Sequence, residues 1–154
     1  MVTRALSIFL AFLRIAAGLS LLMSGLTKLI WLATPALDQQ LAAWSQHPAN
    51  ALVAKYLAFV APHHSLFARL VVVGELSLGA LLVVGLLTPL ASLLAFFMVL
   101  NFQFASSMFS LDYLRGQSGL VYLLVYPILF FGRAGTVLGL DGAIARRGQK
   151  PQGQ

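Results

Sequence analysis

Three polar residues lie inside long apolar stretches of the sequence, where lipid or a protein core would surround them. Arg14 is in the first stretch, Glu75 in the second and Asn101 in the third. Each is roughly nine to twelve residues from one end of its stretch, or about 14–18 Å along a helix at 1.5 Å per residue. A charge at mid-bilayer costs at least about 2.5–3.5 kcal/mol, so such groups normally face the bundle interior and pair. We therefore expect an Arg14–Glu75 ion pair, with Asn101 satisfying a remaining donor or acceptor.

The first apolar stretch carries a stripe of special residues at helical spacing. Arg14, Gly18, Gly25 and Lys28 project to one side of a helix. Because glycines let a second backbone approach closely, this stripe should face the other helices, with Arg14 buried and Lys28 near the outer mouth.

The last apolar stretch carries Ser118, Tyr122 and Tyr126 on one stripe. These tyrosines could donate hydrogen bonds to a carbonyl ligand or to the Glu75 carboxylate. A carboxylate in this position can also pass a proton, so Glu75 and Arg14 are the candidate catalytic residues. The alternative is that the Arg14–Glu75 pair only locks the packing of the helices. The candidate ligand-binding residues are Arg14, Lys28, Glu75, Asn101, Tyr122 and Tyr126.

The composition is that of an integral membrane protein. Of 154 residues, 60% are hydrophobic and only 9% are charged, against about 25% charged in soluble domains. Four apolar runs can serve as membrane spans of about 20 residues. The sequence therefore predicts an all-α bundle of four transmembrane helices, in a single domain over residues 1–145 with a tail at 146–154. The expected spans are residues 5–33, 65–87, 89–109 and 118–131.

The segment 34–64 is too long for a turn and too interrupted to span. Leucines and aromatic residues repeat in it at helical spacing on both sides of His47 and Pro48. We expect one or two short amphipathic helices at the membrane interface, in the first external loop.

Basic residues near the span ends set the expected orientation. The slight excess of Lys and Arg at one end of the spans favours an orientation with both termini in the cytoplasm. The expected location is the inner (plasma) membrane. The net charge of +6 is scattered along the chain, so nucleic acid is not an expected partner. The basic residues on the two sides are Arg4, Arg133, Arg146, Arg147 and Lys150 on the inner side, and Lys28, Lys55, Arg69 and Arg115 on the outer side.

Several kinds of redox centre are not expected on this chain. It has no cysteine, which excludes disulfides, thiol chemistry and Fe–S clusters held by cysteines. The adjacent His63 and His64 lack carboxylates and make a poor metal site, and no metal ligands are predicted. The sequence also lacks paired intramembrane histidines for haem and a glycine motif for flavin or nicotinamide phosphates.

The polar landmarks also resemble a known family. They lie in "GLSLLMSGLTKLIW", "GELSLGALLVVGLLTPLASL", "LNFQFASS" and "GLVYLLVYPILFFGRAGTVLGLDGAIARR". In order and spacing these segments are similar to the DoxX superfamily, especially its DoxD-like branch, over nearly the whole chain. The landmarks that match are Arg14, Lys28, Glu75 and Asp141, whereas "YLRGQSGLVY" departs from the Asn-Gly and acidic pattern expected before the last span.

The resemblance implies a four-helix membrane bundle that several members associate with oxidoreductase complexes, including the membrane subunit of thiosulfate:quinone oxidoreductase. Relatives range from redox partners to trafficking receptors. An apolar cleft with convergent polar groups suits a quinone ring, which Arg14, Tyr122 or Tyr126 could bind while Glu75 passes a proton. Electrons would come from a separate partner, so the isolated chain should not be active alone. The alternatives are a membrane anchor or receptor for a partner protein, and a proton-coupled transporter of a small solute.

Overall fold

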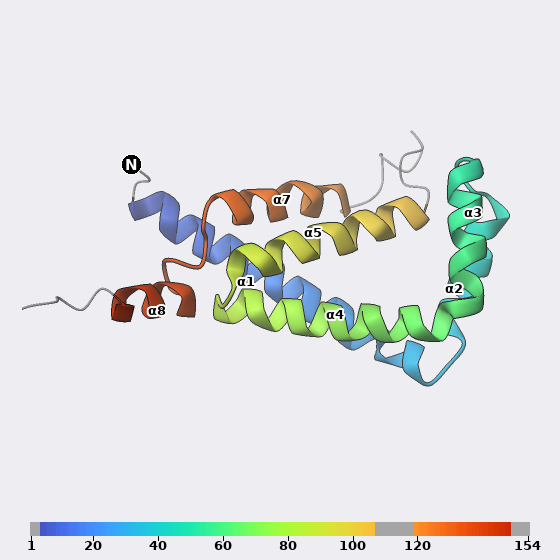
Figure 1. Cartoon of the computed structure of the whole chain (residues 1–154), viewed down its shortest axis with the longest axis horizontal. Helices are drawn as coiled ribbons and strands as arrows, with labels where there is room; N and C mark the ends of the chain where they lie inside the picture. The colour runs from blue at the N-terminus through green and yellow to red at the C-terminus, as the bar shows by residue number, and fades with distance from the viewer. Residues whose placement is uncertain (1–3, 107–118, 149–154) are drawn as a thin grey trace, which may run out of the picture.

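The computed structural model describes residues 4–106 and 119–148, and every regular element in these ranges is helical (Figure 1). The elements, in chain order, are α1 (Arg4–Thr27), η1 (Lys28–Leu32), α2 (Ala36–Gln46), α3 (Ala51–Val60), η2 (Ala61–His63), α4 (His64–Val84), α5 (Thr88–Ala105), α7 (Gly119–Phe131) and α8 (Leu140–Gly148). The predicted all-α fold is confirmed.

The long helices alternate in direction along one axis of the molecule (Figure 1). Helix α1 packs most extensively on α4, and α5 packs on α7, while α4 with α5 and α1 with α7 complete the bundle. Gly18 and Gly79 make the α1–α4 contact close, since a Cβ added at Gly79 would lie 2.9 Å from the carbonyl oxygen of Gly18. The expectation that the glycine stripe of α1 faces another helix is confirmed.

The turn between α4 and α5 is short because its residues suit it. Gly85 ends α4 with φ of 71°, a left-handed conformation that glycine adopts at little cost. Pro89 then lies in the first turn of α5, where its missing N–H is not needed. The two helices form an antiparallel hairpin (Figure 1).

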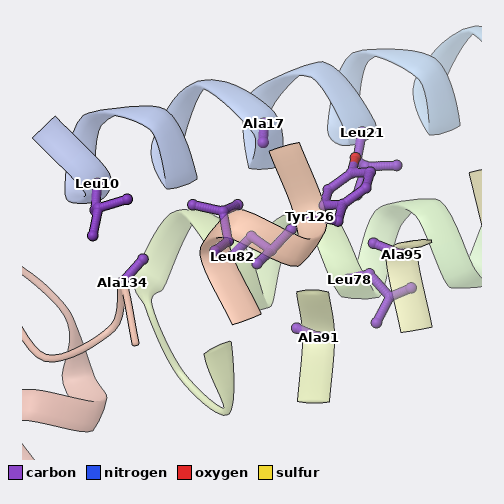
Figure 2. Close-up of a cluster of buried hydrophobic side chains, with 10 residues drawn as sticks. Leu10, Ala17, Leu21, Leu78, Leu82, Ala91, Ala95, Tyr126 and Ala134 are labelled. Atoms are coloured by element: carbon purple, nitrogen blue, oxygen red, sulfur yellow. The ribbon is translucent and has the colours of Figure 1, made fainter. Parts of the chain in front are cut away.

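Two separate apolar cores hold the bundle and the end of it that carries α2 and α3. The first lies between α1, α4, α5 and α7, and Figure 2 shows Leu21, Leu82, Ala95 and Tyr126 converging in it. The second packs the short helices α2 and α3 onto the adjoining ends of α4 and α5. Residues of the second core include Leu37, Leu41, Val53, Leu57, Val60, Ala68 and Ala105.

Helices α2 and α3 lie across one end of the bundle, and α8 lies at the opposite end together with the start of α1 (Figure 1). Asn50 caps α3, because its side-chain oxygen accepts hydrogen bonds from the backbone N–H groups of Leu52 and Val53 at 3.0 and 2.9 Å. Two helices therefore occur within the segment 34–64, as predicted, while their position at a membrane interface stays a prediction. Helix α8 was not predicted.

Three helical stretches are long and apolar enough to cross a membrane, namely Arg4–Leu32, Ala51–Val84 and Thr88–Ala105. Many large apolar side chains on their outer faces are exposed, among them Phe9, Phe12 and Met23, as expected where lipid surrounds a protein. The apolar part of α7, Val121–Phe131, is shorter. The start of the fourth predicted span, residue 118, lies outside the described residues, so a fourth crossing stays a prediction.

Candidate functional site

Arg14 does not pair with Glu75, so that prediction is wrong. The Arg14 side chain is fully buried. Its Nη2 donates to the carbonyl oxygen of Leu138 at 2.8 Å, and its Nη1 donates to that of Ala134 at 3.4 Å. The guanidinium also lies against Gly85, where an added Cβ would be 1.8 Å from Nη1. Arg14 therefore ties α1 to the end of α4 and to the connection that follows α7.

The register of α1 against α4, together with the direction of their side chains, explains the error. Side chains on a helix lean toward its N-terminus. Arg14 therefore leans toward the α8 end of the bundle, whereas Glu75, on the antiparallel α4, leans toward the α2–α3 end. Gly85, which touches the guanidinium, is ten residues beyond Glu75, or about 15 Å along α4. Counting residues from the helix ends predicted similar depths for the two Cα atoms, and this was wrong. Glu75 lies level with Gly25, where an added Cβ would be 3.1 Å from the Glu75 Cβ, and Gly25 is eleven residues or about 16 Å after Arg14.

Asp141 completes the polar cluster around Arg14. Its carboxylate accepts hydrogen bonds from the backbone N–H groups of Leu87 and Thr88, both at 2.8 Å. These N–H groups begin α5 and have no partner within their own helix, and a negative charge there also complements the helix dipole. The Asp141 N–H donates in turn to the Gly85 carbonyl oxygen at 2.9 Å. These hydrogen bonds hold the start of α8 on the α4–α5 turn.

Glu75 pairs instead with Lys28. The Lys28 ammonium donates to Oε1 of Glu75 and, at 2.8 Å, to the Ser24 hydroxyl. It also lies 4.5 Å from the centre of the Phe102 ring and 5.4 Å from that of Trp31, in range of cation–π attraction. The Lys28 side chain is 20% exposed and that of Glu75 only 4%, so the carboxylate is the enclosed member of the pair.

A cavity of about 310 Å³ opens beside this pair. It lies where α1, α4, α5 and α7 meet, and its size is at the lower end of the range for small-molecule sites. Its lining residues are Ser20, Leu21, Ser24, Lys28, Glu75, Val99, Phe102, Gln103, Tyr122 and Tyr126.

Two buried oxygen atoms in the cavity wall have no hydrogen-bond partner among the described residues. They are Oε2 of Glu75 and Oε1 of Gln103, in residues that are 3% and 5% exposed. Buried polar atoms are normally hydrogen-bonded, and leaving one unpaired costs about 1–3 kcal/mol. Both residues line the cavity, so the two unpaired acceptors lie in its wall and the described part of the chain supplies no donor for them.

The two tyrosines of α7 form the opposite wall. The hydroxyls of Tyr122 and Ser20 are 2.6 Å apart and share a hydrogen bond. The rings of Tyr122 and Tyr126 stack with their centres 6.1 Å apart, and Figure 2 shows Tyr126 reaching from α7 toward α1. The third residue of this predicted stripe, Ser118, lies outside the described residues.

Of the six candidate ligand-binding residues, Lys28, Glu75, Tyr122 and Tyr126 line one cavity. Arg14 belongs to the separate cluster near Asp141. Asn101 lies on α5 and exchanges hydrogen bonds with the Tyr56 hydroxyl at 2.7 and 3.0 Å, so its predicted role beside Arg14 and Glu75 is wrong.

The sequence analysis missed three polar residues of the cavity. Ser20 and Ser24 stand eight and four residues before Lys28, so a polar stripe at helical spacing was visible in the sequence. Gln103 lies between Phe102 and Phe104 on α5. An amide flanked by aromatic residues was a signal for a buried polar group, although nothing in the pattern placed it near Glu75.

Comparison with known proteins identifies the family. Neither a curated protein nor a solved structure matches the chain. The sequence pattern of the family described as DoxX matches residues 9–108, which include α1 to α5 almost completely and carry both Lys28 and Glu75. With three helices suited to a membrane and a match over more than half of its length, this chain is a membrane protein of the DoxX family.

Proposed function

We propose that the cavity beside Lys28 and Glu75 binds the ring of a quinone or its reduced quinol, and that the protein is the membrane subunit of an oxidoreductase system. The observation that carries this proposal is the pair of unpartnered buried acceptors, Oε2 of Glu75 and Oε1 of Gln103, in a cavity that also presents a lysine and aromatic rings. The family membership is compatible with the proposal but does not choose among functions.

The polar groups suit a ring whose oxygen atoms accept hydrogen bonds in the quinone and donate them in the reduced quinol. An ammonium has three N–H donors, and Lys28 uses two of them on Ser24 and Glu75. The third can donate to a ligand carbonyl oxygen. The hydroxyl groups of the reduced ring would donate to the free oxygens of Glu75 and Gln103. Phe102 and Tyr126 supply apolar contact to the ring faces.

A bound quinone would supply two-electron chemistry, taking up two electrons and two protons. Glu75 can hold one such proton at Oε2, next to the ligand, and Lys28 keeps the carboxylate oriented through Oε1. The chain has no cysteine, and no group of three or more metal-ligating side chains gathers in residues 4–106 and 119–148. The electrons would therefore come from a separate donor protein that docks on this subunit.

Quinone binding can be tested by fluorescence, because Trp31 lies against Lys28 and Phe102. In a Trp44→Phe background Trp31 is the remaining tryptophan. Protein in lipid nanodiscs would be titrated with decylubiquinone and, separately, with decylubiquinol. We expect the quinone to quench the Trp31 fluorescence saturably. We also expect added quinol to compete with the quinone and reverse this quenching saturably.

The test variant is Lys28→Met/Glu75→Gln, which removes one cation and one anion from the cavity. The matched control is Asp38→Asn/Lys55→Met, which removes the same charges from exposed positions on α2 and α3. Only the cavity variant should lose saturation. Quenching that rises linearly in every variant would show simple partition into lipid, overturn the quinone proposal and favour a membrane anchor or receptor.

A further inference from the structure

We propose that a groove at the α8 end of the bundle binds one anionic phospholipid, with its phosphate between Arg4 and Arg146 and its acyl chains along α1. This site is separate from the cavity beside Glu75, and it does not depend on what that cavity binds. The groove has a volume of about 760 Å³. Arg4, Ile8, Phe12, Leu138, Leu140 and Arg146 are among the residues that line it.

The charge at this end of the bundle favours an anion. Arg4 and Arg146 line the groove, and Arg133 and Arg147 are exposed nearby on the same end. Asp141 is the acidic residue of this end in the described ranges, and both of its carboxylate oxygens already accept backbone hydrogen bonds. Neither Arg4 nor Arg146 forms an ion pair within the described part of the chain. Their guanidinium groups are therefore available for a phosphate, which arginine binds through two parallel N–H donors.

The apolar walls show that the anion is a lipid and not a free ion. Ile8 and Phe12 follow Arg4 at intervals of one helical turn, so an apolar track about 12 Å long leads from the arginine toward the middle of α1. Phe12 is 63% exposed and Leu138 is 65% exposed. Since Arg4–Leu32 is a stretch suited to crossing a membrane, Arg4 stands at its headgroup end and Phe12 at the depth of acyl chains.

Helix α8 has the composition of a helix that lies on a bilayer. Leu140 and Ile144 are exposed and apolar, and Arg146 and Arg147 occupy its last turn. Such helices bind through buried apolar area together with attraction to anionic headgroups. The hydrogen bonds of Asp141 fix the start of α8 on the α4–α5 turn, so α8 is held where Arg146 lines the same groove as Arg4.

The test uses the full chain, purified and delipidated in dodecyl maltoside. Phosphatidylglycerol, phosphatidylcholine or inorganic phosphate would be added while the melting temperature is followed, and retained lipids would be counted by native mass spectrometry. We expect phosphatidylglycerol to stabilise the protein saturably, with one molecule retained. Equal stabilisation by phosphatidylcholine, or full stabilisation by inorganic phosphate, would overturn the proposal.

Variants separate a built site from diffuse attraction. Arg4→Gln/Arg146→Gln should weaken phosphatidylglycerol binding roughly 20- to 30-fold, because each arginine near an anionic headgroup contributes about a fivefold factor. The matched control, Arg133→Gln/Arg147→Gln, removes the same charge from the same end but outside the groove, and should change binding less than about threefold. Equal losses in both pairs, or no loss in either, would refute a specific site.

A third variant guards against a loss of fold. Arg4→Lys/Arg146→Lys keeps the charge and should retain most of the binding, while Phe12→Ser should lower it with both arginines intact. Quinone titration of the Gln pair supplies an independent check, because the cavity beside Glu75 does not include these arginines. Failure of lipid binding would thus leave the quinone proposal untouched, and the reverse also holds.

Discussion

The bundle contains two clusters of buried charge, and they differ in what satisfies them. Near α8, Arg14 donates to the backbone carbonyl groups of Ala134 and Leu138, and Asp141 accepts from the backbone N–H groups that begin α5. Near α2 and α3, Lys28 and Glu75 bind each other and face a cavity.

This difference separates a structural cluster from a candidate binding site. Backbone partners cannot be exchanged for a ligand without opening a turn or a helix end, so the cluster of Arg14 and Asp141 fixes the connections of the bundle. In the cavity, one oxygen of Glu75 and one of Gln103 have no partner among the described residues. The cluster of Arg14 and Asp141 also contains two buried atoms without a partner in the described ranges, Nε of Arg14 and Oγ1 of Thr88. The adjoining cavity, and not the unpaired atoms alone, is therefore what makes the region beside Glu75 the candidate binding site.

The largest effect on stability should come from the structural cluster. Arg14→Met would leave the carbonyl oxygens of Ala134 and Leu138 without their donor and should destabilise the protein by about 2–4 kcal/mol. Thermal or dodecyl sulfate unfolding would measure this change. Arg69→Met, an exposed arginine on α4, is the control and should stay within about 0.5 kcal/mol of the wild type. A tolerated Arg14→Met would show that the cluster is not what holds the end of the bundle.

The next effect concerns the ion pair and distinguishes the two possible partners of Glu75. Lys28→Met and Glu75→Gln should each destabilise by about 2–3 kcal/mol, somewhat less than in a fully buried pair, because Lys28 is partly exposed. The destabilisation of the double variant should be smaller than the sum of the two single effects by about 1–3 kcal/mol.

The parallel cycle of Arg14→Met with Glu75→Gln is the control for this pairing. Those residues have no shared partner within residues 4–106 and 119–148, so their effects should add within about 0.5 kcal/mol. Strong coupling in the Arg14 cycle and none in the Lys28 cycle would mean that Glu75 pairs as the sequence analysis first predicted.

The fold was largely predictable, because hydrophobic runs and turn residues act locally. The apolar runs located α1 with η1, α4, α5 and α7 to within a few residues. Helix α8 was missed because its sequence, "LDGAIARRG", is short and on average polar. Its position depends on the contact of Asp141 with a turn more than fifty residues earlier, which no local pattern reveals.

The candidate site was predictable in its residues but not in its pairing. Helical spacing brought Tyr122 and Tyr126 to one face, and the cost of burying a charge singled out Glu75. The partner of Glu75 depended on the register of α1 against α4, which places Glu75 level with Gly25, and on the reach of the flexible Lys28 side chain. A difference of about 15 Å along α4 decided between Arg14 and Lys28, and residue counting does not resolve it.

A smaller effect should follow from the hydroxyl pair in the cavity wall. Tyr122→Phe removes the hydrogen bond to Ser20 and should cost about 1 kcal/mol, measured by unfolding. In the quinone titration it should lower affinity severalfold, because the ring stays but the polar group at the cavity wall is lost. Tyr56→Phe, which removes a hydroxyl bonded to Asn101 outside this cavity, should cost a similar amount of stability without changing affinity. Equal affinities in the two variants would argue against a contact between the Tyr122 hydroxyl and the quinone.

The smallest effect on stability concerns two amide side chains on the same helix, α5. It is the sharpest test of the difference between satisfied structural groups and the unpaired groups of the cavity. Asn101 is satisfied by the Tyr56 hydroxyl, whereas Oε1 of Gln103 is buried without a partner. Asn101→Leu should therefore destabilise the protein by about 0.5–1.5 kcal/mol and leave quinone binding unchanged. Gln103→Leu removes an unsatisfied acceptor, so its stability should equal or slightly exceed that of the wild type, while quinol affinity falls. A Gln103→Leu protein that is destabilised but binds normally would place this amide with the structural groups, like Arg14, and would leave Glu75 as the single acceptor available to a ligand.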